Sequence, residues 1–235
     1  MNKHPLIDFF YFDGNDDCGR TLTQILNQSD EWLESTHDFI QWLFPLSAKS
    51  GANPDAPLID SKLISAFSLN EIGVNNLIKA FDRMLKFYGL HRENETIRKG
   101  SNWDSRKGFW FTEPTHNDLR ITRIISSLAR LGQERYAKAF LDALNALSKE
   151  PECGFSENAM EYWKSAINSS APSSKTPELK GENSLISADN NHKLRTLLPE
   201  EQFEKVSQLI QNYEENLSRL YKERLEVMEY LTTRR

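Results

Sequence analysis

Apolar side chains recur three and four residues apart along almost the whole chain, and this spacing most constrains its fold. An α-helix turns once every 3.6 residues, so the spacing puts apolar residues on one helix face, whereas a half-buried strand needs strict alternation. Few segments alternate. The sequence therefore predicts an all-α protein, with a single helical domain over residues 6–168, a flexible linker over 169–190 and a long C-terminal heptad-repeat helix over 191–235.

Capping residues set the expected boundaries of the first helices. Thr21 and Gln24 have the spacing of a capping box, in which each side chain bonds the other's backbone amide at a helix start. Asp60 is placed to cap a second short helix. A longer helix that follows is expected to end at Gly89, because glycine adopts the left-handed conformation of a C-terminal cap without strain.

The second half of the domain reads as three more helices after an irregular stretch. Residues 91–115 are polar and irregular, so we expect a long loop, or a helix that is incompletely read. Asn117 is expected to cap the clearest helix, which Gly132 ends. Two more helices are predicted, one over about 133–149 and one after Ser156.

Residues 37–46, HDFIQWLFPL, hold six large apolar side chains in ten positions. A helix from Phe39 to Leu46 would be only about 12 Å long, far short of the roughly 30 Å hydrocarbon core of a bilayer. A groove for a partner is the other alternative to a buried core. We expect core, as the central helix of the domain, beginning near Asp30 with a possible restart at Ser35 or Thr36 and ending at Pro45.

The C-terminal segment carries a heptad repeat, because nine positions follow one another with alternating spacings of three and four. An apolar stripe of this regularity needs a cover, so we predict self-association through residues 203–231, most simply as a dimer. The alternative is a helix that packs back on its own domain. The nine positions are Phe203, Val206, Ile210, Tyr213, Leu217, Leu220, Arg224, Val227 and Leu231.

Composition excludes several protein classes. The sequence has no apolar run long enough for a transmembrane segment and no secretory signal, so a cytoplasmic protein is expected. Cys18 and Cys153 are two isolated cysteines, which we interpret as reduced thiols. No cofactor motif and no metal-ligand spacing is present, so neither a cofactor nor a metal is expected.

The net charge of −5 hides an asymmetry along the chain. Residues 1–60 hold three basic and ten acidic side chains, whereas residues 61–138 hold fourteen basic and eight acidic ones. The acidic average argues against a general nucleic-acid binder. The basic middle of the chain leaves an anionic partner open.

Three motifs resemble the conserved region of the opioid growth factor receptor family: HDFIQWLFPL at 37–46, FYGL at 87–90 and HNDLRITRIISSLARLG at 116–132. The resemblance covers about residues 10–168. It implies an α-helical domain, in a family named for binding an opioid pentapeptide and restraining cell growth in a nuclear or perinuclear setting. The motifs identify no peptide site and the chain lacks the extended repeats of some vertebrate members, so opioid peptide binding is not carried over.

His37 and His116 lie in these motifs, near expected helix starts, with Asp38 next to the first and Asp118 two residues after the second. A histidine beside a carboxylate can transfer protons or bind a metal. Capping or structural hydrogen bonding is the interpretation that we favour, because a helix N-terminus attracts polar side chains.

Arg120 and Arg123 are three residues apart and therefore neighbours on one helix face. An internal carboxylate is the expected partner for the two guanidinium groups. The alternative is a ligand-binding surface for a phosphate, a nucleotide or single-stranded nucleic acid, built from basic and aromatic side chains. Besides the two arginines this surface would use Arg106, Lys107, Trp103 and Trp110.

We therefore expect a binding or regulatory module with an unidentified ligand, for which an anion is one candidate. The alternative function is an enzyme acting on a phosphorylated substrate, with Arg120 and Arg123 as an anion clamp and His37 or His116 as acid or base. No catalytic motif with its required spacing supports the enzyme.

Overall fold

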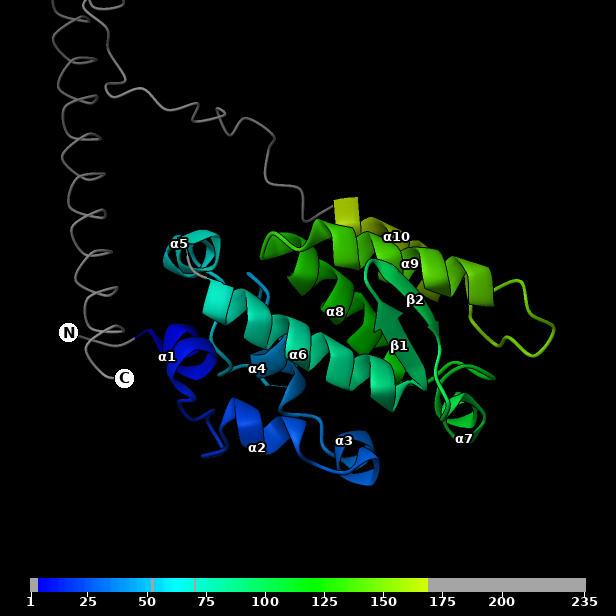
Figure 1. The fold of residues 1–235 in the computed structure, drawn as a ribbon, viewed down its shortest axis with the longest axis horizontal. Helices are drawn as coiled ribbons and strands as arrows, with labels where there is room; N and C mark the ends of the chain where they lie inside the picture. The colour runs from blue at the N-terminus through cyan, green and yellow to red at the C-terminus, as the bar shows by residue number, and fades with distance from the viewer. Residues whose placement is uncertain (1–3, 52, 70, 169–235) are drawn as a thin grey trace, which may run out of the picture. The chain divides into compact units, whose positions relative to one another are not determined.

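The computed structural model describes residues 4–51, 53–69 and 71–168, and Figure 1 shows how their elements are arranged. The elements are, in order, α1 Pro5–Phe12, α2 Leu22–Leu26, α3 Asp30–Ser35, α4 Ile40–Leu43, α5 Ser61–Leu69, α6 Glu71–Phe87, β1 Leu90–Glu93, β2 Thr96–Lys99, α7 Trp103–Arg106, the 3-10 turn Lys107–Phe109, α8 Asn117–Arg130, α9 Glu134–Leu147 and α10 Glu157–Asn168. The described part is mostly helical, with one small antiparallel sheet. The predicted linker and heptad helix, and self-association through 203–231, lie outside the described residues.

The predicted caps explain where two early helices begin. Thr21 and Gln24 form both bonds of the capping box at the start of α2. The Asp60 carboxylate accepts a hydrogen bond of 2.9 Å from the backbone amide of Leu63, in the first turn of α5. Gly89 has a φ of +78°, and it ends α6 as expected. These local signals satisfy amide and carbonyl groups that the helix ends leave unpaired.

The prediction of a central helix through residues 37–46 is wrong, although the large apolar side chains of this segment do lie in the core. α3 stops at Ser35, whose hydroxyl bonds the carbonyl of Glu31, and Thr36 takes an extended conformation. A serine hydroxyl that bonds a carbonyl one turn back weakens helix continuation. α4 then forms a single turn, in which Trp42 is 5% exposed and Leu43 is fully buried.

A two-stranded sheet replaces part of the loop predicted over 91–115 and adds a small β element to a domain that is mostly helical, as predicted. β1 and β2 pair antiparallel, with Leu90 opposite Lys99 and Glu93 opposite Thr96. Each strand is four residues long and buries one side chain, Leu90 or Ile97. A single buried residue per strand is too little to produce a recognisable alternation, which is why the sequence pattern missed the hairpin.

The C-terminal helices pack around α8, which contacts both α9 and α10 (Figure 1). The hairpin joins this half to the first, because β1 contacts α6 and β2 contacts α9. A chain of aromatic rings lies beside them. The ring centroids of Trp103 and Trp110 are 6.1 Å apart, those of Trp110 and Phe155 are 5.5 Å apart, and those of Phe155 and Trp163 are 4.9 Å apart. Among the described residues, no helix has the length and apolar character to span a membrane.

Substitution of two glycines that share a backbone conformation can distinguish the cost of backbone strain from the cost of a steric clash. Gly89 and Gly132 have φ of +78° and +75°, but a Cβ added at Gly89 would lie 2.9 Å from the Cα of Trp103, whereas one at Gly132 meets nothing within 4 Å. Gly132→Ala should cost about 1 kcal/mol of unfolding free energy through backbone strain. Gly89→Ala should cost at least about 1 kcal/mol more. Urea unfolding followed by far-UV circular dichroism measures both, and equal losses would contradict the packing at Gly89.

Candidate functional site

Arg120 is a buried cation that bonds the end of another helix. Its side chain leaves the second turn of α8, and the residue is 4% exposed. Nη2 donates to the carbonyls of Thr36 and Glu34 at 2.8 and 3.4 Å, and Nη1 donates to the Asn117 side-chain oxygen at 3.3 Å. Burial lowers the pKa of this guanidinium. The carbonyls belong to the C-terminal end of α3, where unpaired acceptors favour a cation.

Arg123, one turn further along α8, makes a similar contact with α4. Its Nη1 donates to the carbonyl of Phe44, the C-terminal cap of α4, at 3.2 Å. The side chain is half-buried, and burial lowers its pKa. Within residues 4–51, 53–69 and 71–168 it forms no ion pair. The expected internal carboxylate is therefore not the partner of either arginine in the described part; backbone carbonyls are.

The two histidines lie together beside Arg120. His37 and His116 have ring centroids 5.0 Å apart and nearly perpendicular planes. Nδ1 of His37 lies 3.1 Å from Nη2 of Arg120, and since an arginine only donates, Nδ1 is the acceptor and the neutral ring carries its proton on Nε2. Nε2 of His116 lies 3.4 Å from a carboxylate oxygen of Glu34.

The capping interpretation needs two corrections at the start of α8. His116 occupies the N-cap position but its side chain makes no capping bond, and Asn117, predicted as the cap, is the first residue of the helix. Thr115 takes the capping role, since its hydroxyl accepts from the Asn117 amide at 3.1 Å. The Asn117 side chain instead bonds Arg120 and Glu34. His37 makes a structural hydrogen bond, which its Nδ1 accepts from Nη2 of Arg120.

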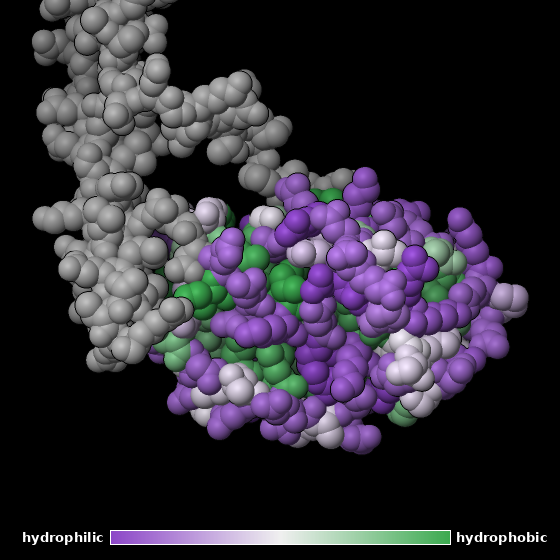
Figure 2. Space-filling model, in the orientation of Figure 1, coloured by the Kyte–Doolittle hydropathy of each residue, from purple (hydrophilic) through white to green (hydrophobic). Residues whose placement is uncertain are grey.

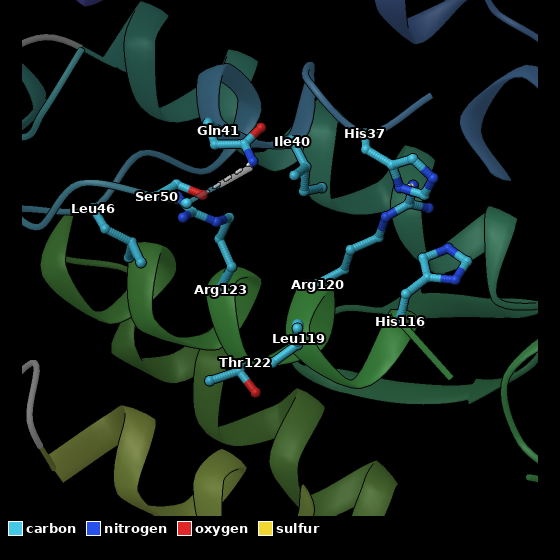
Figure 3. A pocket seen from close by; sticks show the side chains of 11 residues that line it. His37, Ile40, Gln41, Leu46, Ser50, His116, Leu119, Arg120, Thr122 and Arg123 are labelled. Atoms are coloured by element: carbon cyan, nitrogen blue, oxygen red, sulfur yellow. Dashed lines mark hydrogen bonds between the residues drawn. The ribbon is translucent and has the colours of Figure 1, made fainter. Parts of the chain in front are cut away.

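A pocket of about 510 Å³ opens between α8 and the segment 37–51. Figure 3 shows Arg123 beside Gln41 and Ser50 at one end, the two histidines and Arg120 at the other, and Ile40 and Leu119 between them. None of the lining residues is acidic. The lining residues are His37, Ile40, Gln41, Leu46, Ser50, Gly51, His116, Leu119, Arg120, Thr122 and Arg123.

The other predicted ligand-binding residues lie away from this pocket. Trp103 and Trp110 are 7% and 1% exposed, and the indole N–H of Trp110 donates to the Tyr88 carbonyl at 2.9 Å. Arg106 is also buried, with its Nε donating to the Phe87 carbonyl at 2.7 Å. Lys107 pairs with Glu152 at 2.9 Å and Asp104 at 3.2 Å. These four side chains are engaged within the protein.

Sequence reasoning also missed part of the pocket. Leu46 ends the 37–46 motif, which the sequence assigned to the core, and Ser50 and Gly51 follow it; all three line the pocket. Gln41 interrupts the apolar run of the motif and is 3% exposed, and a buried polar side chain of this kind is an informative observation.

Residues 13–176 match the opioid growth factor receptor conserved region. The chain belongs to the opioid growth factor receptor family. It is 34% identical to the rat opioid growth factor receptor over 159 residues, which are 63% of this chain and 27% of that protein. It is 31% identical to the mouse opioid growth factor receptor-like protein 1 over 152 residues, 62% of this chain and 32% of that protein. The chain therefore corresponds to about a third or less of these family members' lengths. No solved structure matches it.

The match confirms the family resemblance, and the pocket lies inside the matched segment. His37, Gln41, His116, Arg120 and Arg123 all fall between residues 13 and 176. The site can therefore be compared between opioid growth factor receptor family members position by position.

Replacing Arg120 tests its structural role. Arg120→Met removes the donors and leaves the carbonyls of Thr36 and Glu34 without this partner, so it should lower the free energy of unfolding by about 2–4 kcal/mol. Arg98→Met is the control, because that side chain is 63% exposed and its ion pair with Glu93 lies on the surface; its loss should stay below about 1 kcal/mol. Equal losses in urea unfolding would contradict the role of Arg120.

Acid titration tests the environment of His116. Burial, and then the charge of Arg120, lower the pKa of His116. Between the unfolded pKa of about 6.5 and the lower folded value, the unfolded chain binds the proton first, so acidification lowers the unfolding free energy. His116→Gln should lose less stability than the wild type between pH 7.5 and 5.5, measured by urea unfolding. His91→Gln is the control on the exposed hairpin, and parallel curves for His116→Gln and wild type would contradict the lowered pKa.

Proposed function

We propose that this domain is a binding module that takes an anionic ligand in the pocket between α4 and α8. The observation that carries the proposal is the half-buried Arg123, which has no carboxylate partner among the described residues. A charge withdrawn from water is costly unless an opposite charge or a set of hydrogen bonds compensates it. A ligand anion would supply the missing charge.

Other partly buried arginines of this domain support the argument by contrast. Nη2 of Arg20 lies 2.7 Å from Oδ2 of Asp16, and Nη2 of Arg92 lies 2.7 Å from Oδ2 of Asp82. Arg83 lies 2.8 Å from Asp30. Among the described residues Arg123 bonds only the Phe44 carbonyl, and it faces a pocket without an acidic lining residue.

A small anion is better supported than single-stranded nucleic acid. Binding of unpaired bases uses exposed aromatic planes. The indole rings of Trp103 and Trp110 belong to the core, and the pocket is lined by no aromatic side chain other than the two histidines. The names of the relatives refer to an opioid growth factor, and no feature of the pocket lining is specific for that ligand.

The enzyme alternative has weaker support from the pocket. An anion clamp needs both arginines, but Nη2 of Arg120 already bonds two carbonyls and His37. Nδ1 of His37 is engaged in the same contact, so it is not placed to accept a proton from a substrate. We therefore retain binding as the proposed function.

Titration with simple anions tests the proposal by nuclear magnetic resonance. Sodium acetate and inorganic phosphate, added at constant low ionic strength against a chloride control, should shift the backbone amide signals of residues 40–51 and 119–123 in a saturable way. The affinity should be no tighter than the micromolar range, because a ligand of four or five heavy atoms gains about 1.5 kcal/mol per atom at most. Arg123→Gln should abolish the shifts.

Arg98→Gln is the matched control, since it removes an exposed arginine on the hairpin that already pairs with Glu93. It should leave the shifts unchanged. If neither anion produces a saturable shift, or if Arg123→Gln responds like the wild type, the proposed function is wrong.

A further inference from the structure

The pocket has a cationic end at Arg123, which suits an anion, and an apolar wall. This division indicates the class of ligand. Leu119 and Arg123 are four residues apart on α8 and therefore lie on the same helix face. Ile40 and Leu46 face them across the pocket (Figure 3). The inference from this arrangement rests on the proposed function, because it requires an anion at Arg123.

The geometry of Arg123 favours a carboxylate head group. Its Nη1 is held by the Phe44 carbonyl at 3.2 Å, which fixes the position of the guanidinium. The edge formed by Nε and Nη2 makes no further hydrogen bond with the described residues. Such an edge presents two parallel N–H groups at the spacing of the two carboxylate oxygens. Arg120, at the other end of the pocket, already donates to two carbonyls and to His37, so the two N–H groups on this edge of Arg123 suit the two oxygens of one carboxylate.

The exposed Leu119 indicates that the ligand has an apolar part. Leu119 is 73% exposed, the highest exposure among the large apolar side chains of the described residues. A single exposed leucine is ordinary on a protein surface, but this one lines a pocket next to an uncompensated cation. The pocket volume of about 510 Å³ lies in the range that holds small molecules.

We propose that the pocket binds a small carboxylate with an apolar body, whose carboxylate lies on the Nε–Nη2 edge of Arg123 and whose body packs on Leu119, Leu46 and Ile40. Burial of the body would remove apolar surface from water, and the carboxylate would neutralise the arginine. The site would thus select among ligands by their charge at one end and by their apolar surface area along its wall.

A homologous series of ligands tests this inference. Acetate, butyrate and hexanoate are titrated by the same amide shifts at low ionic strength. Affinity should rise about threefold to fourfold for each added methylene group. Hexanol, which lacks the charge, should bind at least about tenfold more weakly than hexanoate, and hexyl phosphate should also bind more weakly.

Two variants assign the halves of the ligand to their subsites. Leu119→Ser should reduce the gain from acetate to hexanoate and leave acetate affinity unchanged; its 73% exposure makes a loss of folding unexpected. Arg123→Gln should weaken all three carboxylates alike. Ile64→Ser is the control, because Ile64 is an exposed apolar residue on α5 and lies outside the pocket lining; the series should bind it as it binds wild type.

The outcomes separate this inference from the proposed function. Saturable binding of acetate and phosphate without any dependence on chain length overturns the apolar subsite and leaves the anion site standing. Tighter binding of hexyl phosphate than of hexanoate overturns the carboxylate class. Loss of every response, including those to acetate and phosphate, overturns both proposals.

Discussion

The rest of the site depends on the hydrogen bonds from the buried guanidinium of Arg120 to the end of α3. The first four helices have only four to eight residues each, and helices this short are not stable alone. Arg120 attaches the end of α3 and His37 to α8. That attachment fixes the distance between α8 and the segment that follows α3, and the pocket is the space left between them.

Some acidic side chains of the first 60 residues pair with basic side chains from later in the chain, inside the domain. The acidic first 60 residues provide Asp30 to Arg83 at 2.8 Å and, more distantly, to Arg106 at 3.8 Å. Glu34 lies against His116. Charges of opposite sign that are distant in sequence therefore meet inside the domain. Among the described residues, Arg120 and Arg123 have no carboxylate partner and bond backbone carbonyls instead, and both line the pocket.

Sequence reasoning recovered the features that are encoded locally. The capping box at Thr21, the glycine at 89 and the apolar stripe of α8 each depend on a few neighbouring residues. The hairpin buries one side chain per strand, so the pattern could not show it, whereas the restart allowed at Ser35 or Thr36 agrees with the end of α3 at Ser35. The arginine pair was found, but its partners were not, because backbone carbonyls have no signature in the sequence.

The aromatic chain from Trp103 through Trp110 and Phe155 to Trp163 has an optical consequence. Three of the five tryptophans lie in this one cluster. Excitation energy passes readily between indoles at such separations, so their emission behaves as that of one shared chromophore. Part of the intrinsic fluorescence of the domain therefore reports on the packing of its C-terminal half, whereas Trp32 and Trp42 report on the first half.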